Sequence, residues 1–295
     1  MRIGIIGGGS LGLLLSSYLT AEHDVTLYVK RKQQRDIIHN QRIKLRYSSH
    51  RFSERTVNVA LIDELAAHDI LFICVKQFHI DEVIKQIRHR KPSTATIFLQ
   101  NGMGHISKLA QLPTSVFVGV VEHGAHRVNE NEVNHLGVGA IKLAPYATKS
   151  MSVHSLVQQL HQPAFPFESY ANWQQLLHGK LLINAVINPL TALFDVPNGD
   201  IIANDHIRHL AKQLCKETAH ILNVDYTQAW QNVQRVAIAT KNNTSSMRAD
   251  IIHHRQTEID AISGYIIEKA NGRNIPFTHF VFRAVLVLQE RGRST

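Results

Sequence analysis

The chain has only two cysteines among its 295 residues, Cys74 and Cys215, and they lie far apart. A disulfide-stabilised secreted domain needs several cysteines in regular spacing, so their scarcity argues against one and favours a reducing cytoplasm. Neither cysteine stands in a metal-ligand spacing. Cys74 lies in the apolar stretch Ile70–Val75, which favours a core residue over a nucleophile.

Long hydrophobic runs are also missing. No window approaches the roughly 18 unbroken apolar residues that a membrane helix needs, so we expect no membrane segment. The apolar start, Ile3 to Leu15, is interrupted by glycines and lacks a cleavage-like site, which indicates a strand and a helix rather than a signal peptide. The 19 histidines form no HExxH or comparable motif, so no metal site is expected.

Acidic residues are scarce, with 23 against 32 basic ones and a net charge of +9. A nucleic-acid-binding protein would gather its basic residues into a stripe with aromatic neighbours. The basic residues here are scattered, and we expect no nucleic-acid partner. A phosphate-bearing cofactor and a small anionic substrate would be attracted by the same positive charge.

The first half of the chain alternates predicted strands and helices. This rhythm predicts an α/β domain with a Rossmann-type doubly wound parallel sheet. Further on, Val133–His135 and Gly139–Leu143 have the pattern of short antiparallel strands that extend a sheet edge. The main elements are strands at Arg2–Ile6, Asp24–Val29, Ile70–Val75, Thr94–Leu99 and Ser115–Val121, and helices at Ser10–Thr20, Arg31–Asn40 and His79–His89.

After about Tyr170 the sequence is almost wholly helical. We therefore expect an NADP-binding Rossmann domain at residues 1–170 and an all-helical, substrate-binding and catalytic domain at residues 171–295, with a cleft between them. The predicted helices are Trp173–Asn188, His206–Leu222, Thr227–Val236, Thr257–Asn271 and Thr278–Gln289.

A glycine-rich turn follows the first predicted strand and opens the first helix. The pattern G-x-G-x-x-G is matched by Gly7, Gly8, Gly9, Ser10, Leu11 and Gly12. In such a turn the first glycine permits the bend, the second lets the backbone approach a pyrophosphate, and the third lets the helix pack on the strand. The pyrophosphate would lie on the N–H groups of the helix N-terminus, so the turn predicts a dinucleotide site.

The second predicted strand ends in basic residues, where an NAD site carries an acid. Lys30 and Arg31 stand at this end, and Asp24 lies at the other. An NAD enzyme uses Asp or Glu here to bind the ribose 2′-hydroxyl, whereas Arg can grip a 2′-phosphate with two hydrogen bonds. The cofactor is therefore predicted to be NADPH/NADP+, and the alternative is a solvated charge run.

Three polar residues recur at every fourth position of an otherwise apolar segment. Lys180, Asn184 and Asn188 share one helical face, and a helix this apolar must be buried around most of its circumference. Lys180 is a candidate general acid, because partial burial would lower its pKa; a lysine that extends its amine to solvent is the alternative. We expect Pro189 to end or kink the helix.

Two residues of the later helices are further candidates. Ser246 could bind a carboxylate through its hydroxyl, and Glu258 could accept a hydrogen bond from a substrate hydroxyl. Taken alone, Ser246 or Thr257 could equally cap a helix, and Glu258 could be a surface charge.

Together these motifs resemble the ketopantoate reductase (2-dehydropantoate 2-reductase) family over essentially the whole chain. Related hydroxyacid dehydrogenases share the cofactor fold but not this set of motifs. Besides the glycine-rich turn, the resemblance rests on Val75-Lys76-Gln77, Gln100-Asn101-Gly102-Met103-Gly104, Gly179-Lys180-Leu181-Leu182-Ile183-Asn184, Asn188-Pro189-Leu190-Thr191-Ala192, Pro197-Asn198-Gly199, Ser245-Ser246-Met247 and Thr257-Glu258-Ile259-Asp260.

The resemblance implies a role for each candidate. Lys180 matches the catalytic lysine that protonates or polarises the C2 carbonyl, and Glu258 matches a glutamate that binds the substrate's hydroxyl. The family commonly has one Arg at the end of the second strand, so both Lys30 and Arg31 stay candidates here. Implied substrate-positioning residues are Asn184, Asn188, Asn198 and Ser246, and implied cofactor contacts are Lys76 and Asn101, the latter also near the reacting carbonyl.

The expected activity is NADPH-dependent reduction of 2-dehydropantoate, an anionic 2-keto acid, to (R)-pantoate in pantothenate and coenzyme A biosynthesis. Two alternatives stay open. One is a reductase of another branched 2-keto acid or of an imine, and the other is a non-catalytic NADPH-binding sensor. The C-terminal helices are compatible with a monomer and with a homodimer.

Overall fold

The computed structural model describes residues 1–47, 51–89, 93–148 and 151–291, and the chain divides into two units. The first unit comprises Met1–Gln100 and Ile106–Leu176, and the second comprises Asn101–His105 and Leu177–Thr295. The short segment Asn101–His105 therefore belongs to the second unit, although the first unit surrounds it in the sequence.

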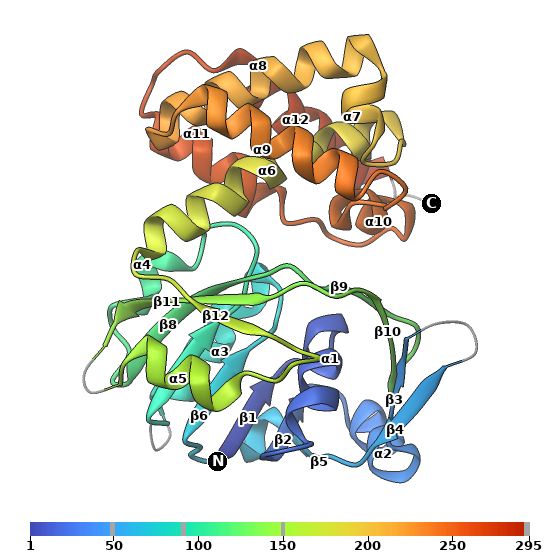
Figure 1. The fold of residues 1–295 in the computed structure, drawn as a ribbon, viewed down its shortest axis with the longest axis vertical. Helices are drawn as coiled ribbons and strands as arrows, with labels where there is room; N and C mark the ends of the chain where they lie inside the picture. The colour runs from blue at the N-terminus through green and yellow to red at the C-terminus, as the bar shows by residue number, and fades with distance from the viewer. Residues whose placement is uncertain (48–50, 90–92, 149–150, 292–295) are drawn as a thin grey trace. The chain divides into compact units, whose positions relative to one another are not determined.

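The first unit is an α/β structure (Figure 1). Its helices and strands in chain order are β1 (Arg2–Ile6), α1 (Ser10–Leu19), β2 (Asp24–Val29), α2 (Lys32–Gln41), β3 (Ile43–Arg46), β4 (Phe52–Arg55), β5 (Asn58–Leu61), β6 (Ile70–Ile73), α3 (Ile80–Arg88), β7 (Ala95–Phe98), α4 (Ile106–Leu109), β8 (Ser115–Val121), β9 (Gly124–Arg127), β10 (Glu132–Gly137), β11 (Ile141–Ala147), α5 (Val153–Leu160) and β12 (Phe167–Ser169). Short 3₁₀ turns lie at Ile62–Glu64 (η1) and Gln77–His79 (η2).

Eight strands form the main sheet, in the order β12-β11-β8-β7-β6-β1-β2-β5. Neighbouring strands are parallel except for β11, which runs antiparallel to β8. β6 and β7 are buried at every position, as expected of central parallel strands covered on both faces. The predicted doubly wound parallel sheet is confirmed, and at one edge β11 and β12 run antiparallel to the other six strands.

A second sheet contains four strands in the order β4-β3-β10-β9. α1 packs between β1 and β2 of the main sheet and β3, β9 and β10 of the second sheet, and its residues from Gly12 to Leu19 are buried. Figure 1 shows these strands beside α1 and α2. The prediction that both Val133–His135 and Gly139–Leu143 extend one edge was wrong for the first, since β10 pairs with β9 and β3.

A buried cluster of aromatic and histidine rings lies where β9 and β10 meet α1. The Tyr18 hydroxyl is 2.8 Å from Nδ1 of His135, whose Nε2 is 3.1 Å from Nδ1 of His123. Phe165 stacks on Tyr18 and on His123 at ring-centroid distances of 4.5 and 4.3 Å. Burial, together with the neighbouring His135, lowers the pKa of His123 to about 4, so this ring is neutral at physiological pH.

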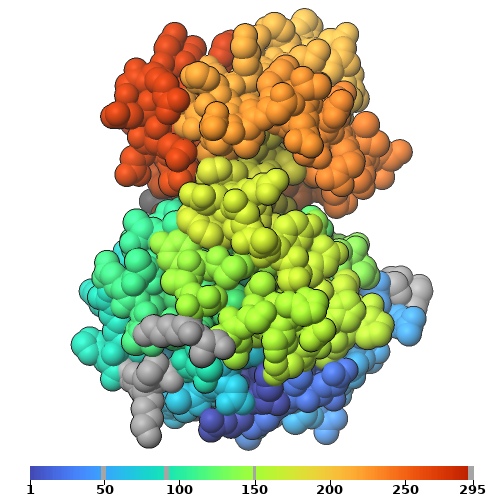
Figure 2. Space-filling model, turned by 60° about the vertical axis from the view of Figure 1, so that its left-hand side comes forward, coloured from blue at the N-terminus to red at the C-terminus, as the bar shows by residue number. Residues whose placement is uncertain are grey.

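The segment with α5 and β12 completes the first unit. Ser152 caps α5 by accepting a hydrogen bond from the His154 N–H at 3.2 Å, and β12 adds to the sheet edge beside β11. In the space-filling view this yellow-green segment occupies much of the face of the first unit that is presented (Figure 2).

The second unit is helical (Figure 1). Its elements are α6 (Trp173–Phe194), whose first four residues belong to the first unit, α7 (Asp200–Ala203), α8 (Asp205–Leu222), α9 (Tyr226–Ala239), α10 (Ser246–Ile252), a π-helical turn η3 (Asp260–Gly264), α11 (Tyr265–Ala270) and α12 (Pro276–Arg291). The predicted all-helical C-terminal region is confirmed.

α6 continues through Pro189 to Phe194, so the prediction that a helix spans only Trp173–Asn188 was wrong. A proline inside a helix removes one backbone hydrogen bond, and the burial of Ile187 and Leu190 on either side offsets that loss. α6 also has the length and mean hydropathy, 1.3, of a membrane span, which the search for an unbroken apolar run does not detect. Because 72% of its apolar window is buried within the protein, it has the character of a core helix.

The region between α9 and α11 differs from the sequence prediction. α10 was not predicted, and the predicted helix Thr257–Asn271 begins as the π-helical turn η3 and continues as α11. Ser245 rather than Ser246 caps α10, since its Oγ accepts from the Arg248 N–H at 3.1 Å. Ser246 is exposed and is not needed as a cap.

Candidate active site

The carboxyl ends of β1, β2 and β6 meet at one edge of the main sheet. In the sheet register Ile6 lies between Tyr28 and Ile73. Two hydrogen bonds extend the pairing past the strand ends, from the Gly7 N–H to the Tyr28 carbonyl at 2.9 Å and from the Cys74 N–H to the Ile6 carbonyl at 2.8 Å. The strand order reverses beside β1, and ligands of doubly wound sheets bind at such a switch point.

The glycines of the turn after β1 differ in what requires them. Gly7 has a φ of +116°, which other residues rarely adopt. A Cβ on Gly12 would lie 1.8 Å from the Gly7 carbonyl oxygen, whereas one on Gly9 would have none of the described atoms within 4 Å. Gly9 precedes α1 directly, so open space lies at this helix N-terminus. The turn therefore has the shape that a dinucleotide pyrophosphate requires.

The two basic residues after β2 are paired with different carboxylates. Nζ of Lys30 is 3.1 Å from Oε2 of Glu82, and Nη2 of Arg31 is 2.5 Å from Oε2 of Glu130. Arg31 directly precedes α2. Its guanidinium therefore already pairs with a carboxylate, two residues beyond β2, the strand next to the glycine-rich turn.

Cys74 and Lys76 follow β6 at the same edge. Cys74 lies just beyond the strand rather than in it. Burial raises the pKa of its thiol, which keeps it protonated and argues against a nucleophile. The Gln100 amide donates to the carbonyls of Ile73 and Val75 at 2.8 and 3.1 Å, and these bonds fix the segment that leads to half-buried Lys76.

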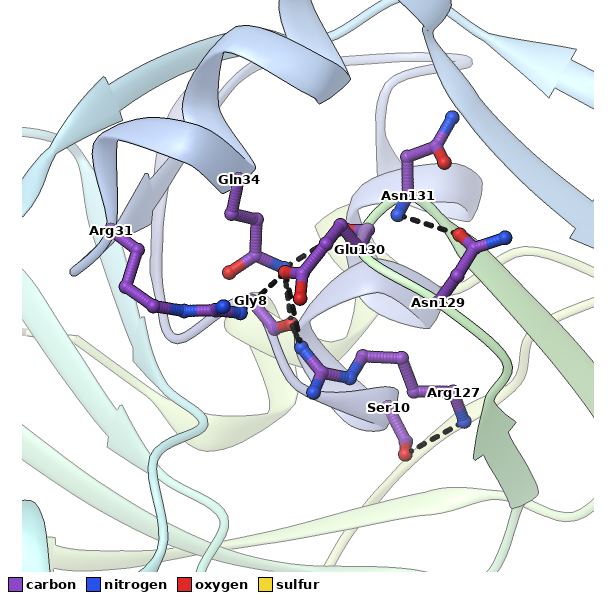
Figure 3. Close-up of polar contacts among 8 residues, drawn as sticks. All are labelled: Gly8, Ser10, Arg31, Gln34, Arg127, Asn129, Glu130 and Asn131. Carbon is purple, nitrogen blue, oxygen red and sulfur yellow. Dashed lines mark hydrogen bonds and ion pairs between the residues drawn. The ribbon is translucent and has the colours of Figure 1, made fainter.

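Side chains that the sequence did not single out also contact the glycine-rich turn (Figure 3). Nε2 of Gln34 donates to the carbonyls of Gly8 and Glu130 at 2.8 and 2.9 Å. Arg127 donates from its backbone N–H to Ser10 Oγ at 3.1 Å and from Nη1 to the Gly8 carbonyl at 3.4 Å. Since these partners lie 26 to 119 positions apart, no local motif could have revealed them.

In the second unit, α6 presents the predicted polar face. Asn184 and Asn188 are each only 7% exposed, among apolar neighbours, and Lys180 is half-buried. Within the described part of the chain, neither asparagine amide hydrogen-bonds to another residue. Neither amide is among the fully buried polar atoms that lack a partner, so both amides keep access to solvent, and this face is open to a polar ligand.

The Asn-Gly-Met motif docks against η3 within the second unit. Nδ2 of Asn101 donates to Oε2 of Glu258 at 3.3 Å, across 157 positions. Gly102 has a φ of +76°, and a Cβ there would lie 2.4 Å from the Ala261 carbonyl oxygen, which accepts from the Met103 N–H at 2.9 Å. The close approach requires glycine, and it brings two predicted site residues together beside a π-helical turn, a feature frequent at functional sites.

The Ser-Ser-Met motif, which contains Ser246, is held beside the second half of α6 through the neighbouring Ser245. The Thr191 hydroxyl donates to Ser245 Oγ at 2.7 Å, three residues after Asn188 in α6. This contact joins two of the predicted motifs, Asn-Pro-Leu-Thr-Ala and Ser-Ser-Met, in space.

Asn198 is 8% exposed in the loop between α6 and α7. Its Nδ2 donates to Thr240 Oγ1 at 2.9 Å, and the Gly199 N–H donates to the Lys241 carbonyl at 3.0 Å. The side-chain oxygen of Asn198 is buried and has no hydrogen-bond partner among the described residues. It is an unsatisfied acceptor, which a ligand hydroxyl could pair.

The predicted site residues thus fall into two groups. The cofactor candidates other than Asn101 lie in the first unit, and the remaining candidates lie in the second unit. The first group is Gly7, Gly8, Gly9, Ser10, Leu11, Gly12, Lys30, Arg31 and Lys76, and the second is Asn101, Lys180, Asn184, Asn188, Asn198, Ser246 and Glu258.

Comparison with curated sequences identifies relatives along the whole chain. The family profile described as ketopantoate reductase PanE/ApbA matches residues 3–148, and the profile of its C-terminal part matches residues 172–289. The 2-dehydropantoate 2-reductase of Bacillus subtilis is 38% identical over 286 residues, which are 96% of this chain and 95% of that protein. The enzyme of the same name from Listeria innocua is 32% identical over 92% and 90% of the two chains.

Solved structures show the same architecture. A crystal structure of a probable 2-dehydropantoate 2-reductase from Bacillus subtilis has a TM-score of 0.88 at 36% identity and covers 98% of this chain and 100% of that one. A D-mandelate dehydrogenase with NADH and anilino(oxo)acetate has a TM-score of 0.92 at 20% identity, over 99% of both chains, and shares the fold. The two profiles and the sequence identity show that this chain is an oxidoreductase of the ketopantoate reductase family.

Proposed function

We propose that this chain reduces 2-dehydropantoate to (R)-pantoate with NADPH, in pantothenate and coenzyme A biosynthesis. The observation that carries the proposal is the polar face of α6, where Lys180 is followed by the two buried amides of Asn184 and Asn188. A cation and two amides on an apolar helix suit a small anion that also carries a carbonyl and a hydroxyl group. The name of the Bacillus subtilis relative supports the same substrate.

NADPH is the proposed cofactor. The open space at Gly9 suits the pyrophosphate, and Arg31 lies on the adjoining strand end, where the adenosine ribose of a dinucleotide binds in this fold. The D-mandelate dehydrogenase of the same fold is described with NADH, so the fold alone is compatible with either nicotinamide. The guanidinium of Arg31 favours the cofactor that bears a 2′-phosphate.

Lys180 is the proposed general acid. When bound, the nicotinamide supplies the hydride that reduces the C2 carbonyl. The ammonium group of Lys180 would stabilise the negative charge that develops on the C2 oxygen and would then give that oxygen its proton. Its half-buried position on α6 supports the proposal, because a charge that is partly shielded from water interacts more strongly with a bound anion.

The remaining polar groups are proposed to orient the substrate. Glu258 would accept a hydrogen bond from the substrate hydroxyl, with its carboxylate oriented by the Asn101 amide at 3.3 Å. Ser246 would donate to the substrate carboxylate. The amides of Asn184 and Asn188 and the unsatisfied oxygen of Asn198 would bind the other polar atoms.

The test is a substrate panel with both nicotinamides. Purified protein should oxidise NADPH when 2-dehydropantoate is added, and it should do so more efficiently than with NADH or with other branched 2-keto acids. Turnover of a different 2-keto acid alone would replace the proposed substrate. Tight NADPH binding without turnover of any member of the panel would instead favour a sensor.

The cytoplasm is the proposed location. Both cysteines of the chain, Cys74 and Cys215, are unpaired thiols, as is usual for proteins of a reducing compartment. Fractionation of cells that express a tagged chain would test this proposal.

A further inference from the structure

The turn between β9 and β10 brings an acidic side chain to the end of β2 (Figure 3). The carboxylate Oε2 of Glu130 lies 2.5 Å from Nη2 of Arg31 and 3.6 Å from Nη1 of Arg127. One carboxylate is thus shared between two guanidinium groups. The side chain of Glu130 is 25% exposed, and those of Arg31 and Arg127 are 50% and 36% exposed, so the cluster is open to a ligand.

The position of this turn does not depend on the Glu130 side chain. The Glu130 carbonyl accepts from Gln34 Nε2 at 2.9 Å. The neighbouring Asn131 donates from its backbone to Asn129 Oδ1 at 3.0 Å and from its side chain to the Arg42 carbonyl at 2.7 Å. A substitution that changes only the Glu130 carboxylate should therefore leave the turn in place.

The carboxylate affects the two nicotinamides in opposite ways. A phosphate monoester carries a charge of about −1.5 to −2 at neutral pH, and on Arg31 it would meet the negative charge of Glu130. NADH has a 2′-hydroxyl at this place, and a hydroxyl can donate a hydrogen bond to a carboxylate. NAD-dependent enzymes place an acid at the end of the second strand for this purpose.

We propose that Glu130 is a specificity-determining residue of the cofactor site. Its carboxylate competes with the 2′-phosphate of NADPH for Arg31, and it accepts a hydrogen bond from the 2′-hydroxyl of NADH. Both effects reduce the ratio by which the site binds NADPH more tightly than NADH. The sequence at the end of β2 contains no acid, and the fold supplies one from 99 positions away. The inference rests on the proposed cofactor site and adds to it an acidic residue from the turn that joins β9 and β10.

The test compares wild type with Glu130→Gln, which removes the charge and keeps the shape. Calorimetric titration measures Kd for NADPH and NADH, and for the fragments 2′-phospho-ADP-ribose and ADP-ribose. The ratio of Kd for NADH to Kd for NADPH should rise about tenfold, a modest change because exposed charges are screened by solvent. The change should shrink at high salt, and the fragments should show the same shift without any turnover.

Glu82→Gln is the matched control, because Glu82 pairs with Lys30 at 3.1 Å as Glu130 pairs with Arg31. The proposal is supported if Glu130→Gln shifts the ratio and Glu82→Gln does not. An unchanged ratio, equal changes for both nucleotides, or a shift in Glu82→Gln instead would each overturn it. Failure of the wild type to bind either nucleotide would overturn the proposed cofactor site itself, and the two failures are thus distinguishable.

Discussion

The two units differ in how they form their candidate binding sites. In the first unit the site is mainly backbone: a bend at Gly7, a close contact at Gly12 and an open helix N-terminus after Gly9. In the second unit it is made of side chains on α6 and on the segments packed near it, such as Asn101 with Glu258. A backbone site is part of the fold, whereas a side-chain site is added to a fold that could exist without it.

The difference predicts opposite relations between stability and function. Glycines that the fold requires cannot be replaced without harm to both. A buried polar atom without an intramolecular partner, such as Oδ1 of Asn198, is unfavourable for folding and is explained by binding. Substitutions of these side chains in the second unit should therefore separate stability from activity, whereas among Gly7, Gly9 and Gly12 only a substitution of Gly9 should separate them.

The largest effect on activity is expected for Lys180→Ala. Loss of the proposed general acid should lower kcat/KM for 2-dehydropantoate by about 10²- to 10⁴-fold, with little change in Tm. Steady-state kinetics and thermal unfolding measure both quantities. The control is Lys216→Ala, which removes an exposed lysine of α8. A Lys180→Ala enzyme of near wild-type speed would remove this residue from the mechanism.

Gly12→Ala and Gly9→Ala form the next pair. The Gly12 Cβ would lie 1.8 Å from the Gly7 carbonyl oxygen, so we expect a loss of at least about 3 kcal/mol of folding free energy, since overpacking usually costs 1–3 kcal/mol and this contact is extreme. Gly9→Ala should leave Tm unchanged and weaken NADPH binding about tenfold. The added methyl group would press on the bound pyrophosphate, and a cost of about 1.4 kcal/mol in binding free energy corresponds to that factor. Equal effects of the two variants on Tm would contradict the distinction.

Asn184→Leu should act in the opposite direction on stability. Replacing an amide that makes no hydrogen bond within the described residues by an apolar side chain of similar size should keep or raise Tm. The lost hydrogen bond to an anionic substrate should raise KM for the keto acid about 10- to 100-fold, as expected of about 1.5–3 kcal/mol for a bond to a charged group. Asn242→Leu in the turn after α9, where the residue is exposed, is a control. A fall in Tm with unchanged KM would show a structural role.

The smallest effect is expected from a fall in pH, which should destabilise the first unit more than the second. Burial lowers the pKa of His123 to about 4, with His135 adding to the effect, and burial also lowers that of His135 itself. Between the ordinary value of 6.5 and the folded value, the unfolded chain binds protons that the folded chain does not, so stability must fall as the pH falls through this range. In the second unit burial lowers the pKa of His178, again from 6.5.

Hydrogen exchange at pH 7 and at pH 5 would measure this difference. Amides of β9 and β10 should lose protection more than those of α8. His123→Gln should reduce the loss, and His154→Gln, at an exposed position of α5, should not. An equal loss of protection in wild type and His123→Gln would exclude this histidine as the cause.

The sequence predicted the backbone site better than the arrangement around it. The order of strand, glycines and helix is local, so Gly7 to Gly12 and the central strands could be placed from periodicity and turn chemistry. The second sheet could not, because β9 (Gly-Ala-His-Arg) has no apolar alternation and β10 pairs with a strand 88 residues earlier, as in Glu132 with Lys44. Glu130 was missed for the same reason.

In the second unit, the spacing of four residues between Lys180, Asn184 and Asn188 predicted one helical face without any tertiary information. The end of that helix was predicted wrongly, since local proline chemistry is outweighed by packing on both sides of Pro189. The contact of Asn101 with Glu258 spans 157 positions, and neither residue type nor spacing could have paired them.

The crossing of Asn101–His105 into the second unit also limits how such a protein could be recombined. A single exchange of gene segments near residue 176 would join a new helical half to an old first half, and with it an Asn101 and a Gly102 from a different parent. The Glu258 carboxylate and the Ala261 carbonyl, which these residues contact, would then come from another lineage. A chimera that keeps these contacts would have to carry Asn101–His105 along with the second unit, so one crossover near residue 176 does not exchange the two units cleanly.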